Sequence, residues 1–185
     1  MNAQVLTQIQ PRPEPIRPIL QLVPQEVRTV APQQVSVRRA RAGDVAAMFA
    51  LLDHFAKREL LLPRSIQDVY RNVREFVVAV DENDAVVGCG GLRVYSPVLG
   101  EIVALAVDES CHGMGVGRSI VNALIEDARG MDMCRVFAMT LQEGFFHRLE
   151  FETTHITAFP EKITYDCSRC AKAKRCIEIA VARDI

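Results

Sequence analysis

The sequence predicts a mixed α/β domain. Short apolar segments of strand length recur between polar turns, and two longer segments carry apolar residues at helical spacing. A glycine-rich loop at residues 113–117 joins one of these strands to one of the helices. Of the 185 residues, 49% are apolar and 24% are charged, which is typical of a globular protein. These patterns predict strands and helices within one domain and leave the strand order open.

Residues 1–34 have a different composition from the rest of the chain. They hold six prolines and seven glutamines and show no hydrophobic periodicity. Proline removes backbone donors and fixes φ, which favours an extended chain. We therefore expect residues 1–34 to form a disordered tail, with the folded domain beginning near residue 35.

The first strand and two helices are predicted from residue 35 onward. Residues 35–39 alternate apolar and polar side chains, as a half-buried strand does. Asp44 is a candidate N-cap for the first helix. Pro63 requires a loop, after which Ser65 can cap a second helix that ends near residue 73. The apolar face of the first helix consists of Val45, Met48, Phe49, Leu52 and Phe55.

Three strands and a long helix follow. Residues 76–80 and 85–92 are apolar strands joined by the polar hairpin loop 81–84. Residues 100–107 are apolar on both faces, which predicts a central strand. The long helix spans about residues 115–129, with an apolar stripe formed by Val116, Ile120, Leu124 and Ala128.

The last part of the chain predicts one more helix between strands. We expect a strand at residues 135–140, a short helix at 144–149 and a strand at 151–156. A final alternating segment at 177–181 predicts a strand at the edge of the sheet.

The glycine-rich loop has the chemistry of a phosphate site. Gly113, Gly115 and Gly117 follow a strand directly and open an amphipathic helix. Glycines allow close approach of a ligand to backbone amides, and the first turn of a helix offers unpaired N–H groups. The loop comes late in the chain and lacks a following Gly-Lys-Ser/Thr, which argues against dinucleotide and P-loop sites. A pyrophosphate group on another carrier fits better.

The segment Leu105-Ala106-Val107, together with His112 through Gly117, resembles the acetyl-coenzyme A signature of the GNAT superfamily. His112 stands where that family usually has Arg or Gln. The resemblance spans about residues 35–157 and also includes Arg38-x-Ala40-x-x-x-Asp44 and Phe145-Phe146-x-x-Leu149-x-Phe151. It implies a GNAT-type mixed sheet, mostly antiparallel, with helices on both faces and acetyl-CoA as co-substrate.

The same resemblance implies the cofactor contacts. Backbone groups of Leu105, Ala106 and Val107 would pair with the amides of the pantetheine arm as an added strand does. The diphosphate would lie against the loop residues His112, Gly113, Met114, Gly115, Val116, Gly117 and Arg118.

Glu101 is the candidate catalytic base. It lies near the start of the predicted central strand and resembles the carboxylate that many family members use. An apolar environment raises the proton affinity of a carboxylate, which suits a base near neutral pH. Alternatively, Glu101 pairs with an arginine at the sheet edge. The general-acid Tyr of the family falls on Phe146, so that role is not carried over, and His147 is either a substitute acid or an ordinary surface residue.

Within the family, the chain is most similar to short single-domain N-acetylglutamate synthases of arginine biosynthesis. The similar features are the segment 61–65, Gly100-Glu101, and the ending that contains Cys167, Cys170 and Cys176. This resemblance implies L-glutamate as the acceptor. Arginine binds carboxylates with paired hydrogen bonds, so Arg64 and then Arg93 are candidate substrate ligands. Each could instead be an ordinary surface arginine.

Two other functions remain open on the sequence. The chain could acetylate another small amine or a peptide N-terminus with the same fold and cofactor. It could also be a non-catalytic sensor of acyl-CoA, in which Phe146 reflects lost chemistry.

The segment 158–185 is expected to pack on the domain as a cysteine-containing extension. Cys167-x-x-Cys170 with Cys176 resembles part of a zinc site, but zinc normally takes four ligands. His155 could complete such a site in space. Reduced cysteines or a disulfide are favoured over a metal, and we assign no metal-binding residues.

The net charge is −1, which offers no general attraction to nucleic acid or to an anionic membrane. No apolar run approaches the roughly 20 residues that span a bilayer. Without an export signal, a cytoplasmic location is the default expectation. The partner predicted is a small molecule, and the oligomeric state is open, with a homodimer as one option.

Overall fold

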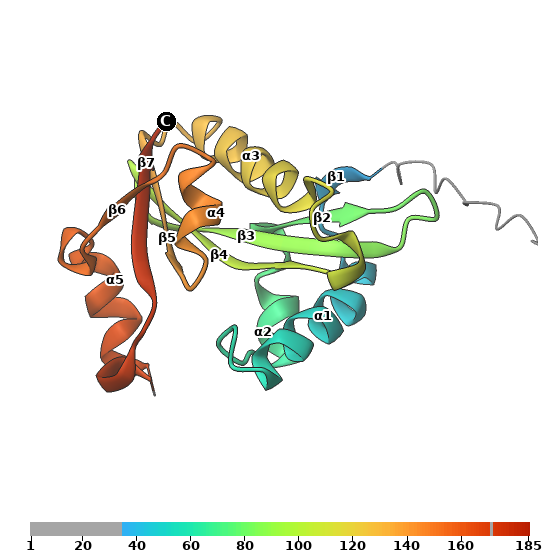
Figure 1. Cartoon of the computed structure of the whole chain (residues 1–185), viewed down its shortest axis with the longest axis horizontal. Coiled ribbons are helices and arrows are strands. Elements are labelled where there is room, and N and C mark those ends of the chain that lie inside the picture. Colours follow the sequence, from blue (N-terminus) through green and yellow to red (C-terminus); the bar gives the residue numbers. More distant parts are fainter. Residues whose placement is uncertain (1–34, 171) are drawn as a thin grey trace, which may run out of the picture. The chain divides into compact units, whose positions relative to one another are not determined.

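The computed structural model describes residues 35–170 and 172–185, and the predicted tail lies outside the described residues. Within this part, strands form one seven-stranded sheet in the order β1-β2-β3-β4-β5-β7-β6. Neighbouring strands are antiparallel except β4 and β5, which are parallel and are connected through helix α3. The predicted mixed α/β fold with a mostly antiparallel sheet is confirmed (Figure 1).

The elements follow the predicted order and add one helix. The strands are β1 Ser36–Arg39, β2 Phe76–Val80, β3 Val86–Ser96, β4 Leu99–Val107, β5 Arg135–Thr140, β6 Glu152–Thr154 and β7 Ile179–Asp184. The helices are α1 Val45–Lys57, α2 Ile66–Arg71, α3 Val116–Arg129, α4 Glu143–His147 and α5 Pro160–Tyr165.

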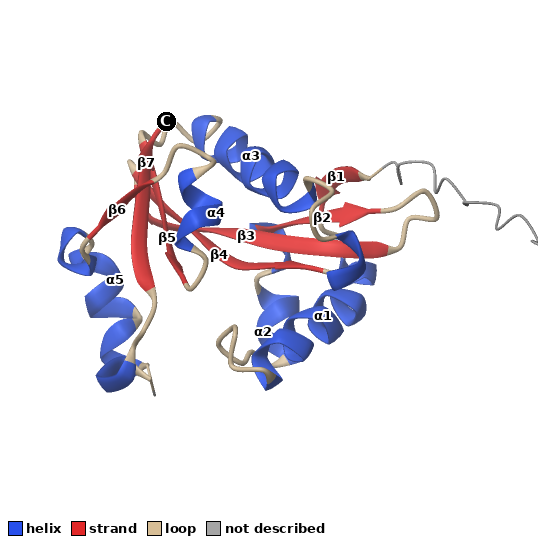
Figure 2. Cartoon of the chain, in the orientation of Figure 1, coloured by secondary structure: helices blue, strands red, loops and turns tan. Residues whose placement is uncertain are grey.

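Helices cover both faces of the sheet (Figure 2). Helices α1 and α2 pack on the side of Val78 and Val80, whereas α3 packs on the side of Val77 and Ala79. Every residue of β2 is buried because side chains alternate between the two covered faces. This explains why β2 and β4 are nearly continuous apolar runs.

The two predicted caps have different outcomes. Ser65 caps α2 as predicted, and its hydroxyl accepts a hydrogen bond from the amide of Asp68 (3.1 Å). Asp44 precedes α1, but its carboxylate makes no bond to the first turn of that helix. It accepts hydrogen bonds from Arg38 Nη1 (2.7 Å) and from the amide of Arg41 (2.6 Å). The capping prediction for Asp44 is therefore wrong, because an arginine on β1 and a nearby amide take the carboxylate.

Helix α3 approaches β3 closely because β3 has glycine where the two meet. A Cβ on Gly90 would lie 2.8 Å from Ile120 Cγ2 and 3.2 Å from Leu124 Cδ1. Both side chains are fully buried, and Cγ2 of a β-branched residue has little freedom to move aside. Glycine therefore sets the distance between α3 and the sheet.

Gly90→Ala is expected to lower the free energy of unfolding by about 1–3 kcal/mol, the usual effect of overpacking a core. Urea titration monitored by circular dichroism measures the change. Gly43→Ala is the matched control, since a Cβ there would meet no atom within 4 Å. An equal loss in both variants would show that close packing against α3 is not the cause.

Strand β4 bends midway along its length. Its pairing with β3 shifts register between Cys89↔Ala106 and Gly91↔Val103, and Ala104 in the interval has a φ of 53°. An extra residue on one strand is a β-bulge, which bends the strand and increases its twist.

Strands β4 and β5 share only a short ladder. They pair from Leu99↔Arg135 to Glu101↔Phe137, and no later residue of β4 pairs with another strand on that side within the described chain. The two strands separate beyond this point (Figure 1). Residues 102–107 therefore present backbone groups on the β5 side that the sheet does not use.

The C-terminal part differs most from the prediction. The final strand is β7, and it lies between β5 and β6, so the prediction of an edge strand at 177–181 is wrong. The edge strand on this side is β6, which is shorter than the predicted 151–156. Helix α5 was not predicted. Strand β3 extends four residues beyond the predicted end at residue 92, which brings Tyr95 into the sheet.

Candidate active site

Glu101 lies in the interior of the molecule. It is 2% exposed on β4, at the last position where β4 pairs with β5. Its Oε2 accepts a hydrogen bond from the hydroxyl of Tyr95 on β3 (2.8 Å). Lys162 Nζ from α5 lies 2.8 Å from Oε1 and 3.0 Å from Oε2. Side chains from three different elements therefore meet at one buried carboxylate.

A second carboxylate extends this arrangement. Asp166 Oδ2 accepts hydrogen bonds from Lys162 Nζ (3.0 Å), from Arg93 Nη1 (3.0 Å) and from the Tyr95 hydroxyl. We call the five connected residues, Arg93, Tyr95, Glu101, Lys162 and Asp166, the Glu101 network. It contains two cations and two carboxylates, so its charges balance when both acids are ionised.

The environment shifts the pKa values of both carboxyl groups in opposite directions. Burial raises the pKa of Glu101 above its usual value, although Lys162, Tyr95 and Arg93 act against this rise. Burial acts the same way on Asp166, but hydrogen bonds from Tyr95 and Lys162 outweigh it and lower the pKa of Asp166 to about 2. The two acids are therefore differentiated: Asp166 stays ionised, whereas Glu101 has the higher proton affinity that a general base needs.

Arg64 lies close to the Glu101 network. It precedes α2 in the loop fixed by the Ser65 cap. Burial and the neighbouring charge of Arg93 lower the pKa of Arg64, while Glu75 and Glu101 act in the opposite direction. No described residue forms a hydrogen bond or ion pair with the Arg64 guanidinium. A partly buried guanidinium without a partner is suited to bind an anion.

Glu75 is a further acid in this region. One of its carboxylate oxygens is buried and has no hydrogen-bond partner within the described residues. Burial raises the pKa of Glu75, against the attraction of Arg93 and Arg64. Glu75, Arg64, Arg93 and Glu101 thus influence one another electrostatically, although they come from distant parts of the sequence.

The glycine-rich loop has open space above it. Gly113 and Gly115 have φ values of 78° and 82°, and Gly115 is the residue before the first turn of α3. A Cβ at either glycine would meet no atom within 4 Å. In the described chain, no backbone carbonyl accepts a hydrogen bond from the Gly113 or Gly115 amide. Exposed amides at the start of a 14-residue helix fit a diphosphate group.

The predicted cofactor-contacting residues lie along one continuous path. Leu105, Ala106 and Val107 form the end of β4, on the stretch that β5 leaves unpaired. The path leads through the turn at residues 109–111 to the glycine loop. Free backbone groups on β4 followed by free amides at a helix start fit an amide-containing arm that ends in a diphosphate. Met114 is 44% exposed in this loop, and Val116 is buried beneath it.

His112 is placed differently from its predicted role. Its Nε2 lies 2.9 Å from the carbonyl oxygen of Val107, so the ring links the loop back to the end of β4. In this arrangement the ring nitrogen is committed to a backbone carbonyl that the pantetheine prediction also needs. Arg118, in the first turn of α3, remains exposed.

The two side chains considered for a general acid point elsewhere. Phe146 is 4% exposed and packs edge-on against Phe145 and Phe151, so it belongs to the core. His147 Nε2 lies 2.8 Å from Thr153 Oγ1 and 3.6 Å from Glu143 Oε1. Neither residue is part of the Glu101 network.

Three residues at the site were missed from the sequence: Tyr95, Lys162 and Asp166. Tyr95 continues the strand alternation that the prediction ended at residue 92. Lys162 and Asp166 are spaced i, i+4 after Pro160, which is a helix-start residue, so a short helix with an ion pair could have been read there. Nothing in the sequence connects that helix with Glu101.

All six cysteines are free. Within the described residues, no group of three or more His, Cys, Asp or Glu side chains is arranged to hold a metal ion. His155, considered as a fourth zinc ligand, lies with Nδ1 2.8 Å from Thr157 Oγ1.

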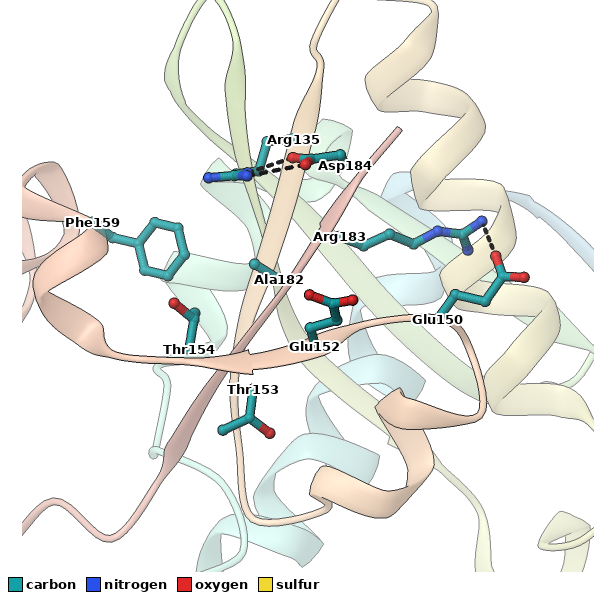
Figure 3. Close-up of a pocket in the computed structure, with 9 residues that line it drawn as sticks. All are labelled: Arg135, Glu150, Glu152, Thr153, Thr154, Phe159, Ala182, Arg183 and Asp184. Atoms are coloured by element: carbon teal, nitrogen blue, oxygen red, sulfur yellow. Dashed lines mark hydrogen bonds and ion pairs between the residues drawn. The ribbon is translucent and has the colours of Figure 1, made fainter.

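An open polar recess of about 390 Å³ lies elsewhere, between β5, β6 and β7 (Figure 3). Two ion pairs, Arg135–Asp184 and Arg183–Glu150, line it together with Glu152. None of the predicted site residues lines this recess. Within the described part of the chain, no helix is long and apolar enough to cross a membrane.

Comparisons with known proteins agree in family and fold. A family model described as the Acetyltransferase (GNAT) family matches residues 46–151. An amino-acid acetyltransferase from Mycobacterium tuberculosis is 42% identical over 127 residues, which cover 66% of this chain and 72% of that protein.

Two similar proteins have been crystallised with coenzyme A. One, from Mycobacterium tuberculosis, is 33% identical with a TM-score of 0.72, and the match covers 81% of this chain and 99% of that one. The other is an N-acetylglutamate synthase from Neisseria gonorrhoeae, solved with coenzyme A and N-acetyl-glutamate. It is 25% identical with a TM-score of 0.74, and the match covers 82% of this chain but 35% of that one.

Proposed function

The chain belongs to the GNAT family of acetyltransferases, and from this premise we propose that it transfers acetyl from acetyl-CoA to the amino group of L-glutamate. The observation that carries the acceptor is the pairing of a buried acid with a free guanidinium: Glu101 is 2% exposed, and Arg64 beside it has no partner among the described residues. An amino-acid acceptor needs both a base for its amine and a cation for a carboxylate.

On the donor side, the loop and the unpaired end of β4 would hold coenzyme A. Gly113 to Arg118 would bind the diphosphate through backbone amides, and Leu105 to Val107 would pair with the pantetheine arm. Because β4 leads from Glu101 to Val107, the reactive thioester would lie toward the Glu101 end of the strand. Rotation of the His112 ring away from the Val107 carbonyl would free that carbonyl for the arm.

On the acceptor side, Arg64 would bind one carboxylate of glutamate. Arg93 also lies at the site but is held by Asp166 (3.0 Å), so we assign it to the second carboxylate only after Arg64. The amine would be deprotonated by Glu101, directly or through water. Its nitrogen then bonds to the thioester carbonyl carbon, the C–S bond breaks, and coenzyme A leaves as a thiolate that takes up a proton.

No side chain is assigned as the acid for that thiolate. Phe146 has no proton to give, and the Tyr95 hydroxyl is bound by Glu101 and Asp166. A thiolate is a stable enough leaving group to depart without a dedicated acid. The reaction therefore depends on the base and on orientation more than on acid catalysis.

Chromatographic measurement of released coenzyme A across the twenty amino acids tests the function. We expect release that depends on L-glutamate and a product with the mass of N-acetylglutamate. Chromatography is preferred over a thiol dye because the chain itself has six free cysteines. Release with another amine would overturn the glutamate assignment. Tight acetyl-CoA binding without turnover would instead support the non-catalytic sensor.

This proposal also places the protein in arginine biosynthesis, which uses N-acetylglutamate, and in the cytoplasm. It retains the division into a tail (1–34), a catalytic domain (35–157) and a C-terminal extension (158–185). In this view the extension takes part in catalysis, because Lys162 and Asp166 belong to it.

A further inference from the structure

The C-terminal extension contributes a cation to the buried acid. Lys162 is on α5, 61 residues after Glu101, and its side chain is 13% exposed. The start of α5 is fixed by Phe159, which is 1% exposed and stacks on Phe137 with ring centroids 4.0 Å apart. Phe137 is the ladder partner of Glu101 on β5. The same sheet position therefore holds both the acid and the helix that brings Lys162 to it.

The ammonium group of Lys162 is occupied by carboxylates. It contacts both oxygens of Glu101 at 2.8 and 3.0 Å and Asp166 Oδ2 at 3.0 Å. An ammonium has three donors and no acceptor, so these contacts leave it little capacity to act on a substrate. Its position suits a supporting role toward Glu101.

Several other charged groups face Glu101. Tyr95 and Arg93 approach from β3, Arg64 from the loop before α2, and Asp166 from the end of α5. Among the groups that favour the ionised form of Glu101, Lys162 has the strongest effect, ahead of Tyr95 and Arg93. Without it, burial would act on the carboxylate with weaker opposition, and a protonated Glu101 cannot accept a proton from the amine.

We propose that Lys162 is a positioning residue for acetyl transfer, which keeps Glu101 ionised and correctly oriented while Asp166 in turn holds Lys162. This inference rests on the proposed role of Glu101 as the base. It extends the active site to the C-terminal extension, beyond the residues 46–151 that the family model matches.

Lys162→Met tests the proposal by removing the charge while keeping most of the side-chain length. The carboxyl ¹³C titration of Glu101, identified as the signal lost in Glu101→Gln, should move to higher pH by about one to three units, as expected when an opposite charge is removed. The acid limb of kcat/KM should move with it. Activity at neutral pH should fall about tenfold or more and recover substantially at higher pH.

Two further variants separate charge from packing. Lys162→Arg keeps the charge and should retain the wild-type Glu101 titration, whereas Lys162→Gln should shift it as Lys162→Met does. Lys162→Gln also serves if the Met variant does not fold. Lys174→Met removes an exposed lysine from the same extension and should change nothing.

An unchanged Glu101 titration in a folded Lys162→Met or Lys162→Gln protein would overturn the proposal, as would equal loss in Lys162→Arg. The NMR titration requires no acceptor, so it decides the role of Lys162 even if glutamate is not acetylated. A wild-type protein that is inactive with glutamate would contradict the proposed function alone.

Discussion

Glu101→Gln is expected to lower kcat for acetyl transfer by about 10²–10⁴-fold, the usual contribution of a positioned general base. Glutamine has nearly the same shape but cannot accept the amine proton. The fall should appear in kcat while the affinity for coenzyme A, measured by calorimetry, stays unchanged, because the glycine loop lies at the other end of β4.

Two controls accompany this variant. Glu82→Gln changes an exposed acid in the β2–β3 hairpin and should leave kcat at the wild-type value. A Glu101→Gln enzyme with nearly full kcat would show that Glu101 is a structural partner of Lys162 and not the base.

The pH profile of the wild-type enzyme gives the same acid a second test. Burial raises the pKa of Glu101, so activity should be lost as pH falls through a value above the ordinary carboxyl range. The sign follows from the role: a base works only when it is unprotonated, and a raised pKa moves the acid limb upward. This limb should be absent from any residual activity of Glu101→Gln.

Arg64→Ala is expected to raise the KM for glutamate by about 30- to 1,000-fold. Removing one partner of a desolvated charge pair typically costs about 2–4 kcal/mol, and each 1.4 kcal/mol is tenfold in affinity. The KM for acetyl-CoA should change little. Steady-state kinetics with each substrate varied in turn measure both constants.

Arg71→Ala is the matched control for Arg64, since Arg71 is an exposed arginine at the end of α2. Arg64→Lys should restore only part of the affinity, because a lysine cannot form the paired hydrogen bonds of a guanidinium. A glutamate KM that is unchanged in Arg64→Ala would remove Arg64 from the acceptor site.

The features that the sequence predicted well are those encoded locally. Alternation of side chains gave β1 and β2, and Ser65 with Asp68 gave the start of α2. The glycines at 113 and 115 were predicted to permit a tight turn, and both have the positive φ that favours glycine.

The features that were missed depend on contacts between distant segments. The last strand contains Arg183 and Asp184, which suggested an edge. In the structure these residues pair with Glu150 and Arg135 beside the strand, so β7 can lie between two neighbours. The approach of Lys162 to Glu101 depends on the stacking of Phe159 on Phe137, which no periodicity reveals.

The interior position of β7 has a consequence for how the protein is made on the ribosome. Strand β6 pairs only with β7, and β5 has β7 on one side, so this half of the sheet cannot close until residue 184 has left the exit tunnel. The earlier strands β1 to β4 can assemble while translation continues, since each pairs with a strand already synthesised. A nascent chain halted before residue 179 would thus expose the flank of β5 to aggregation or to quality-control proteases.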